Sequence, residues 1–239
     1  MLLAELEVFH SRPIAPTRRV ALGARHLPVD PAPGFGGILL AGIVAAHIAD
    51  LDPELFDDLH RLTHQLQEGH RIPQPRLRHR LQVDTIGLTR SRHRLYGGGE
   101  DLEFDFEETG APAQHILAAV YAAGALPLVA RGRVMEGLRA AMRWTGSLNR
   151  AFVATVTGLD RHAPWSVAAF HDPVRWAIDT LGLHHEVNGH GLPDRTAVQR
   201  RFRELLRAAH PDHGGARDAA AARIAELTEA RRILLHDHP

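Results

Sequence analysis

The sequence predicts an α+β fold, in which a mixed α+β domain is followed by a small all-α helical hairpin. Three observations support this prediction. Short runs with a period of two, typical of half-buried strands, occur between residues 5 and 108. Residues 112–157 have helical patterning, and two amphipathic stripes follow near the end of the chain. At 239 residues the chain can form two domains with cores, which we expect at residues 1–165 and 170–239.

Two short strands are expected near the N-terminus, because residues 5–8 alternate between acidic and apolar and residues 20–22 continue the pattern. A glycine-rich stretch at residues 34–37 then precedes an apolar run at residues 38–49. Such a stretch can hold a phosphate at a helix N-terminus. Here it has no Lys, no complete G-x-G-x-x-G and no βαβ context. We therefore expect a tight turn that leads into a buried helix.

The next helix is expected to begin at Asp52, a capping residue that precedes a proline in the first turn. Its buried stripe consists of Leu55, Leu59, Leu62 and Leu66. His60 and His64 stand four residues apart, a spacing that can bind zinc, and Asp57 shares their face. That face is opposite the leucines, where solvated residues belong, and no third ligand is compelling. We expect no metal site and no cofactor.

Three further strands are expected at residues 77–83, 90–96 and 100–108, and three consecutive glycines form a turn before the last. One strand has a basic outer face and another an acidic one, so cross-strand charge pairing explains both. The alternative is that the basic residues bind nucleic acid or an acidic client. These residues are Arg76, Arg78, Arg80, Arg90, Arg92 and Arg94.

Helices are expected at residues 114–123, 134–144 and 148–157, followed by a linker at residues 158–164. The first 165 residues resemble no family that we recognise. Besides binding nucleic acid or an acidic client, this region could be an enzyme. No nucleophile, carboxylate pair or histidine cluster in it has the context that would identify one.

Composition excludes several classes of function. Without Cys, the chain cannot form disulfides, use a catalytic thiolate or bind zinc through Cys. Its 28 basic residues, all Arg, balance 28 acidic ones, and zero net charge argues against broad binding to nucleic acid or anionic membranes. The N-terminus lacks the basic region of a signal peptide. The apolar runs are shorter than the roughly 20 residues that cross a bilayer. We expect a cytoplasmic protein that does not enter the membrane.

Two amphipathic helices are expected near the C-terminus. The apolar stripe of the first comprises Val198, Phe202, Leu205, Leu206 and Ala209, and its N-cap is Asp194 or Thr196. Pro211 disfavours α geometry in the preceding residue, so this helix ends by residue 209 or 210. The second stripe comprises Ala220, Ile224, Leu227, Arg231 and Leu234. Antiparallel packing would bury both stripes and leave the connecting loop outside.

These residues resemble the J domain of DnaJ-like co-chaperones. Residues 202–212, Phe-Arg-Glu-Leu-Leu-Arg-Ala-Ala-His-Pro-Asp, are similar to that family's second helix and the His-Pro-Asp loop that follows it. Residues 225–230 resemble its third helix, and residues 178–183 resemble the end of its first. The resemblance runs from residue 172 to the end of the chain. Three matches in the family's order are more specific than one tripeptide.

The resemblance implies a co-chaperone that is not itself an enzyme and that docks on a DnaK-class heat-shock chaperone and stimulates its ATP hydrolysis. The implied docking residues are His210, Pro211, Asp212, Arg200, Arg203 and Arg207. Asp212 would accept charge-assisted hydrogen bonds from a partner Arg. The three arginines, along one exposed helix face, would attract an acidic surface. The N-terminal domain would supply client or partner binding.

The chain departs from the family pattern at two positions and at its end. His213 stands where a basic residue is usual, Arg231 stands where an aromatic is usual, and too few residues follow Leu235 for a fourth helix. Two other interpretations stay open. The His-Pro-Asp sequence could simply end a helix, or the Arg-rich helix and strands could bind nucleic acid. Zero net charge and the matched acidic strand count against the second interpretation.

Overall fold

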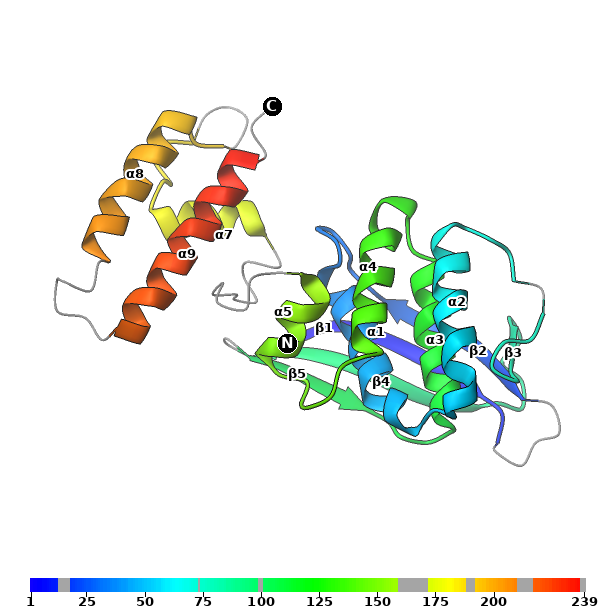
Figure 1. The fold of residues 1–239 in the computed structure, drawn as a ribbon. Coiled ribbons are helices and arrows are strands. Elements are labelled where there is room, and N and C mark those ends of the chain that lie inside the picture. The colour runs from blue at the N-terminus through cyan, green and yellow to red at the C-terminus, as the bar shows by residue number, and fades with distance from the viewer. Residues whose placement is uncertain are drawn as a thin grey trace. The chain divides into compact units, whose positions relative to one another are not determined.

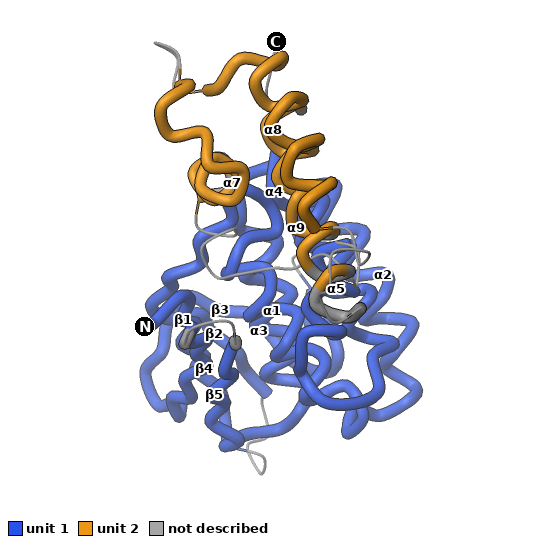
Figure 2. Tube along the Cα trace, turned by 90° about the vertical axis from the view of Figure 1, so that its left-hand side faces the viewer, with its two compact units in different colours: residues 1–159 blue, residues 160–239 orange. Residues whose placement is uncertain are grey.

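The chain forms two compact units, residues 1–159 and residues 160–239 (Figure 2). The structure, a computed structural model, describes residues 1–12, 18–72, 74–98, 101–158, 172–187, 192–209 and 217–236. Unit 1 combines a five-stranded sheet with helices, and the described part of unit 2 contains helices. The predicted α+β class is therefore confirmed. The domain ranges expected from the sequence were 1–165 and 170–239.

The sheet of unit 1 has the strand order β3-β2-β1-β4-β5 (Figure 1). Its strands are β1 (Leu2–His10), β2 (Arg19–His26), β3 (Arg80–Gln82), β4 (Thr89–Gly98) and β5 (Asp101–Phe106). All pairs are antiparallel except β2 with β3. The strands expected at residues 5–8, 20–22, 90–96 and 100–108 are therefore confirmed. Side chains alternate across each strand, so Leu6 and Val8 of β1 are buried while Glu5 and Glu7 point to the opposite face.

The strand predicted at residues 77–83 is wrong over most of its length, since β3 has only three residues. Leu77 and Arg78 have φ values of 47° and 61°, which belong to the left-handed region rather than to a strand. His79 bridges back to Arg76 across this turn. Leu77 is nevertheless buried, whereas Val83 is 96% exposed. The strand-like alternation of residues 77–83 thus came in part from Leu77, which is buried in a turn and not in a strand.

Five α-helices of unit 1 are α1 (Gly34–His47), α2 (Phe56–Gln67), α3 (Pro112–Gly124), α4 (Leu128–Ala141) and α5 (Arg150–Thr157). Helices α1 and α3 lie against one face of the sheet, and α2 and α4 pack on these two helices (Figure 1). Helix α1 is buried from Gly34 to Val44. A Cβ at Gly42 would overlap the ring of Phe104 on β5, so glycine allows α1 to approach the sheet closely.

Several helix boundaries differ from those expected. Residues 34–37 form the first turn of α1 instead of a separate turn. Helix α4 begins at Leu128, because Pro127 occupies its N-cap, and ends at Ala141. Leu128 and Val129 are 72% and 93% exposed, so the start of this helix lacks an amphipathic pattern. No helix within the described residues is long and apolar enough to cross a membrane.

Unit 2 contains α7 (Pro173–Leu181), α8 (Arg195–Ala208) and α9 (Arg217–His236). Each helix contributes to one apolar core, and α9 packs against both α7 and α8. The buried core residues are Ala177, Ile178, Leu181, Leu183, Ala197, Val198, Phe202, Leu227, Ala230 and Leu234. The two predicted C-terminal helices and the helix before them are therefore confirmed.

Candidate functional site

Helix α8 carries the positively charged face that the sequence predicted. The side chain of Asp194 accepts a hydrogen bond from the backbone N–H of Thr196, so Asp194 is the N-cap rather than Thr196. Val198 and Phe202 are buried on one side of this helix. The other side exposes the three arginines that were predicted to dock, Arg200, Arg203 and Arg207.

The three arginines of this face differ in their partners. Arg200 makes a bidentate pair with Glu186, with Nη2 at 2.9 Å from Oε1 and 2.8 Å from Oε2. Within the described part of the chain, Arg203 and Arg207 make no ion pair. Among the described residues, two of the three guanidinium groups therefore have no carboxylate partner.

A small pocket lies beside this face, between α8 and α9. It has a volume of about 290 Å³ and is lined by Gln199, Phe202, Arg203 and Arg231. The guanidinium of Arg231 lies 4.8 Å from the centre of the Phe202 ring, a cation–π distance. Arg231, which stands where the J-domain family usually has an aromatic residue, therefore covers the ring of Phe202. It also adds a second cation, beside Arg203, to the pocket.

The His-Pro-Asp sequence of the predicted site lies outside the described residues. His210, Pro211 and Asp212 follow α8 in the sequence and precede α9. The same holds for the expected linker beyond Gly158, which is itself the left-handed C-cap of α5 with φ 65°.

Of the six arginines that the sequence offered as an alternative site, Arg90, Arg92 and Arg94 of β4 pair with carboxylates on the outer face of the sheet. Arg94 lies 2.8 Å from Glu5 and 3.2 Å from Asp105. Arg90 and Arg92 each lie 3.4 Å from Glu7. The acidic partner is therefore mainly β1 and only in part β5, because β1 is the other neighbour of β4 and points its glutamates to the same face. This pairing offsets the charge of the three β4 arginines. Arg78 pairs with Asp52 and Glu54, whereas Arg76 donates to the side chain of Gln65 and Arg80 is exposed.

The histidine pair on α2 remains a surface feature. The rings of His60 and His64 lie 4.9 Å apart, and His64 is exposed. In the part of the chain that the structure describes, no group of three potential metal ligands includes either residue.

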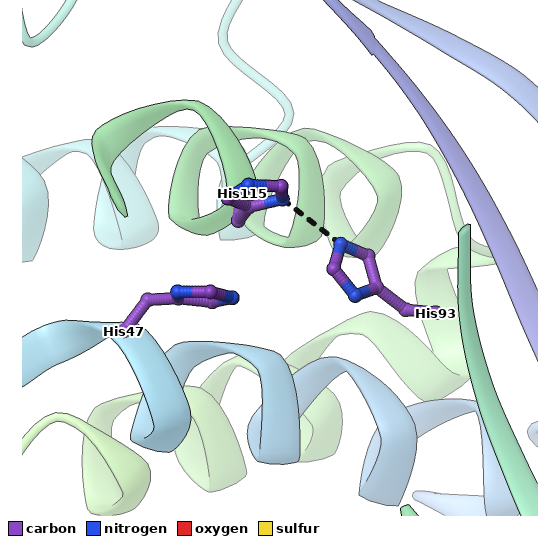
Figure 3. A group of neighbouring side chains, drawn as sticks. All are labelled: His47, His93 and His115. Atoms are coloured by element: carbon purple, nitrogen blue, oxygen red, sulfur yellow. Dashed lines mark hydrogen bonds between the residues drawn. The ribbon is translucent and has the colours of Figure 1, made fainter. Parts of the chain in front are cut away.

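A different set of histidines meets in the core of unit 1, between the sheet and two helices. His47 ends α1, His93 lies on β4 and His115 lies in the first half of α3, and their rings face one another (Figure 3). One nitrogen from each ring lies within 4.8 Å of one nitrogen from each of the others. Nε2 of His93 and Nδ1 of His115 are hydrogen-bonded at 2.9 Å. We call these three residues the histidine cluster.

Several nitrogens in and beside the histidine cluster are buried and have no hydrogen-bond partner in the part of the chain that the structure describes. They are Nε2 of His47, Nδ1 of His93, Nε2 of His115 and Nδ1 of His10. His10 lies on β1, and its ring meets that of His115 edge-on at 5.6 Å. Its Nε2 is held by the hydroxyl of Ser91 at 2.9 Å, and this hydroxyl donates to the carbonyl of Thr109 at 2.9 Å. His10 is thus a fixed neighbour of the histidine cluster.

Burial favours the neutral form of each histidine in the histidine cluster. It lowers the pKa of His93 to about 3 and the pKa of His115 to about 2, and the neighbouring histidines add to both shifts. Burial also lowers the pKa of His47 and of His10. Near pH 7 the imidazoles of His93 and His115 therefore carry no charge, and each keeps one nitrogen lone pair.

The histidine cluster was not predicted from the sequence, although two signals were present. His93 stands at a core position of the alternation in β4, between Ser91 and Leu95, and both neighbours are buried. His115 interrupts an apolar helical run in the same way. Neither observation shows that the two rings meet, because residues 93 and 115 are brought together only by the packing of α3 on the sheet.

Comparisons with models of protein families, with curated proteins and with solved structures found nothing that matches this chain.

Proposed function

We propose that the protein is a J-domain co-chaperone, which docks on a DnaK-class heat-shock chaperone in the cytoplasm and stimulates its ATP hydrolysis. One observation carries the proposal. Helices α7, α8 and α9 share a single core, and the sequence His210-Pro211-Asp212 lies between the two helices that carry the family-like stripes. A His-Pro-Asp that arose by chance would not require a partner helix on each side of it.

Charge on α8 supports the same function. Arg203 and Arg207 are exposed on α8, and Arg231 adds a cation beside Arg203 in the adjacent pocket. Such a surface speeds encounter with an acidic partner and makes binding depend on salt. In this proposal the chemistry belongs to the ATPase, unit 1 binds a client or partner protein, and residues 210–212 make the specific contact.

Charge reversal on α8 tests the docking face. We expect the double variant Arg203→Glu/Arg207→Glu to raise the concentration needed for half-maximal ATPase stimulation by about tenfold at low salt, since attraction becomes repulsion. The difference should shrink as salt increases, because exposed charges are screened. Both side chains are exposed, so folding should change by no more than about 0.5 kcal/mol per site. Steady-state ATP hydrolysis over a salt series provides the measurement.

The matched control is Arg61→Glu/Arg71→Glu in unit 1, which makes the same change in net charge at two exposed positions. It should stimulate like the wild type. Equal loss in both double variants would mean that net charge, rather than the face of α8, sets the rate. Unchanged stimulation by the α8 variant at low salt would show that the docking face has been assigned to the wrong surface.

A further inference from the structure

We propose that His47, His93 and His115 bind one divalent transition-metal ion of the zinc class in the core of unit 1. The three residues come from α1, β4 and α3, so the ion would join the two inner helices to the sheet (Figure 3). All three residues belong to unit 1, and the inference does not rest on the co-chaperone proposal.

The spacing of the nitrogens suits such an ion. A tetrahedral zinc ion with Zn–N bonds of about 2.0–2.1 Å separates its nitrogen ligands by about 3.3 Å. The nitrogens of His93 and His115 are 2.9 Å apart, and all three candidate nitrogens lie within 4.8 Å of one another. Ring movements of about 1.5 Å or less would therefore complete the coordination.

One ring must turn for this to happen. The rings of His47 and His115 are stacked, with centroids 4.5 Å apart and planes 15° from parallel. Each lone pair lies in the plane of its ring, so stacked rings direct their lone pairs along nearly parallel lines. His47 is the last residue of α1, and its ring would have to tilt toward His93.

The protons can be placed without charging either ring. In the hydrogen bond between His93 and His115, one of the two facing nitrogens carries a proton. Binding would move that proton to the other nitrogen of the same ring, so that both facing lone pairs reach the ion. The receiving atom, Nδ1 of His93 or Nε2 of His115, is buried and has no hydrogen-bond partner among the described residues.

The histidine cluster is also difficult to explain as a part of the apolar core. The buried residues beside it in α1 and α3 are mostly apolar, and burying polar imidazole rings among them opposes folding. His93 and His115 are 0% and 1% exposed, and each also has a second nitrogen with no hydrogen-bond partner among the described residues. An ion held by the facing lone pairs would add coordinate bonds to the buried rings, while the second nitrogens would remain as buried N–H groups.

The donor set selects the kind of ion. Imidazole nitrogen suits Zn²⁺ and its neighbours in the transition series, whereas Mg²⁺ and Ca²⁺ prefer oxygen ligands. Three protein ligands leave a fourth tetrahedral position, which in catalytic zinc sites holds water. The group contains no carboxylate or further histidine from the described residues. The fourth position is thus assigned to water or a small anion.

The test is metal binding by the full chain, purified without a polyhistidine tag and stripped with a chelator. We expect one tight equivalent of Zn²⁺ by calorimetric titration, and no response to Mg²⁺. Zinc at about one hundred times its Kd should raise the melting temperature of unit 1 by roughly 5 °C or more. Substituting Co²⁺ should give the intense visible absorption of a four-coordinate ion at one equivalent.

Variants assign the binding to the histidine cluster. Loss of a second-shell partner alone weakens metal binding roughly 10- to 100-fold, so His47→Gln, which removes a ligand, should weaken it by at least about 100-fold. The matched control, His60→Gln/His64→Gln, removes the surface pair and should bind zinc like the wild type. Unchanged binding by His47→Gln, or binding lost in the control, would overturn the proposal. So would wild-type protein with only the weak bands of six-coordinate Co²⁺, a result that depends on no variant.

Discussion

Asp212→Asn is expected to raise the concentration of protein needed for half-maximal stimulation of a DnaK-class ATPase by about thirtyfold. In the proposed complex, Asp212 accepts charge-assisted hydrogen bonds from an arginine of the chaperone. Asn has nearly the same shape but no charge, so the arginine would be left under-paired. Such a loss corresponds to roughly 2 kcal/mol. Steady-state ATP hydrolysis at a series of protein concentrations would measure it, with His210→Gln assayed in parallel.

The matched control is Asp179→Asn, which removes the same charge from an exposed side chain of α7 that lies 3.3 Å from His184. It should stimulate like the wild type. If residues 210–212 only end α8, then Pro211 still stops that helix in both variants, and every activity should survive. If Asp212→Asn and His210→Gln both stimulate as well as the wild type, residues 210–212 do not make the specific contact with the chaperone.

Leu227→Ala is expected to destabilise unit 2 by about 3 kcal/mol, a large share of the stability of so small a unit. Leu227 is 0% exposed and lies in the core shared by α7, α8 and α9. Truncation removes apolar contacts and leaves a cavity that three helices cannot readily fill. Native-state hydrogen exchange should become roughly a hundredfold faster in peptides from α7 and α9, and stay unchanged in α1.

Thr228→Ala provides the control for this substitution. Thr228 is the next residue of α9, is exposed, and loses only a hydrogen bond from its hydroxyl to the carbonyl of Ile224. Its effect should be within about 0.5 kcal/mol. Equal exchange rates in Leu227→Ala and the wild type would show that the core of unit 2 does not hold its helices together.

The sequence was most informative where a backbone rule and a side-chain pattern agree. Helix α8 is such a case, because Asp194 caps its start and it ends at Ala208, in agreement with the end by residue 209 or 210 that Pro211 predicts. The alternation in β4 likewise predicted a strand with arginines on one face. These features depend on residues close together in the chain, so short windows contain the necessary information.

Other features depend on backbone angles that composition does not reveal. Residues 77–83 alternate like a strand, yet the left-handed conformation of Leu77 and Arg78 restricts β3 to three residues. Helix α4 begins at Leu128, although the exposure of Leu128 and Val129 removes its amphipathic signal there. In both places the pattern of apolar residues does not follow the backbone conformation.

The histidine cluster could not be predicted from spacing at all. His60 and His64 show the local i, i+4 signal that is used to identify a metal site, but they lie on a partly solvated helix face. His47, His93 and His115 have no such local spacing and meet only because α1 and α3 pack on the same face of the sheet. Ligands from three distant segments require the topology, which the alternation alone does not specify.

The co-chaperone proposal is tested most directly by single-turnover hydrolysis of ATP bound to a DnaK-class chaperone, measured with increasing amounts of the full chain. The proposal predicts that the hydrolysis rate rises with protein concentration and then saturates. The rate at saturation should be about tenfold or more above the unstimulated rate, which is the usual size of coupling between two sites. The rise should be weaker at high salt. A rate that stays at the unstimulated value up to the highest protein concentration, at low salt and with α8 confirmed to be folded, would contradict the proposal.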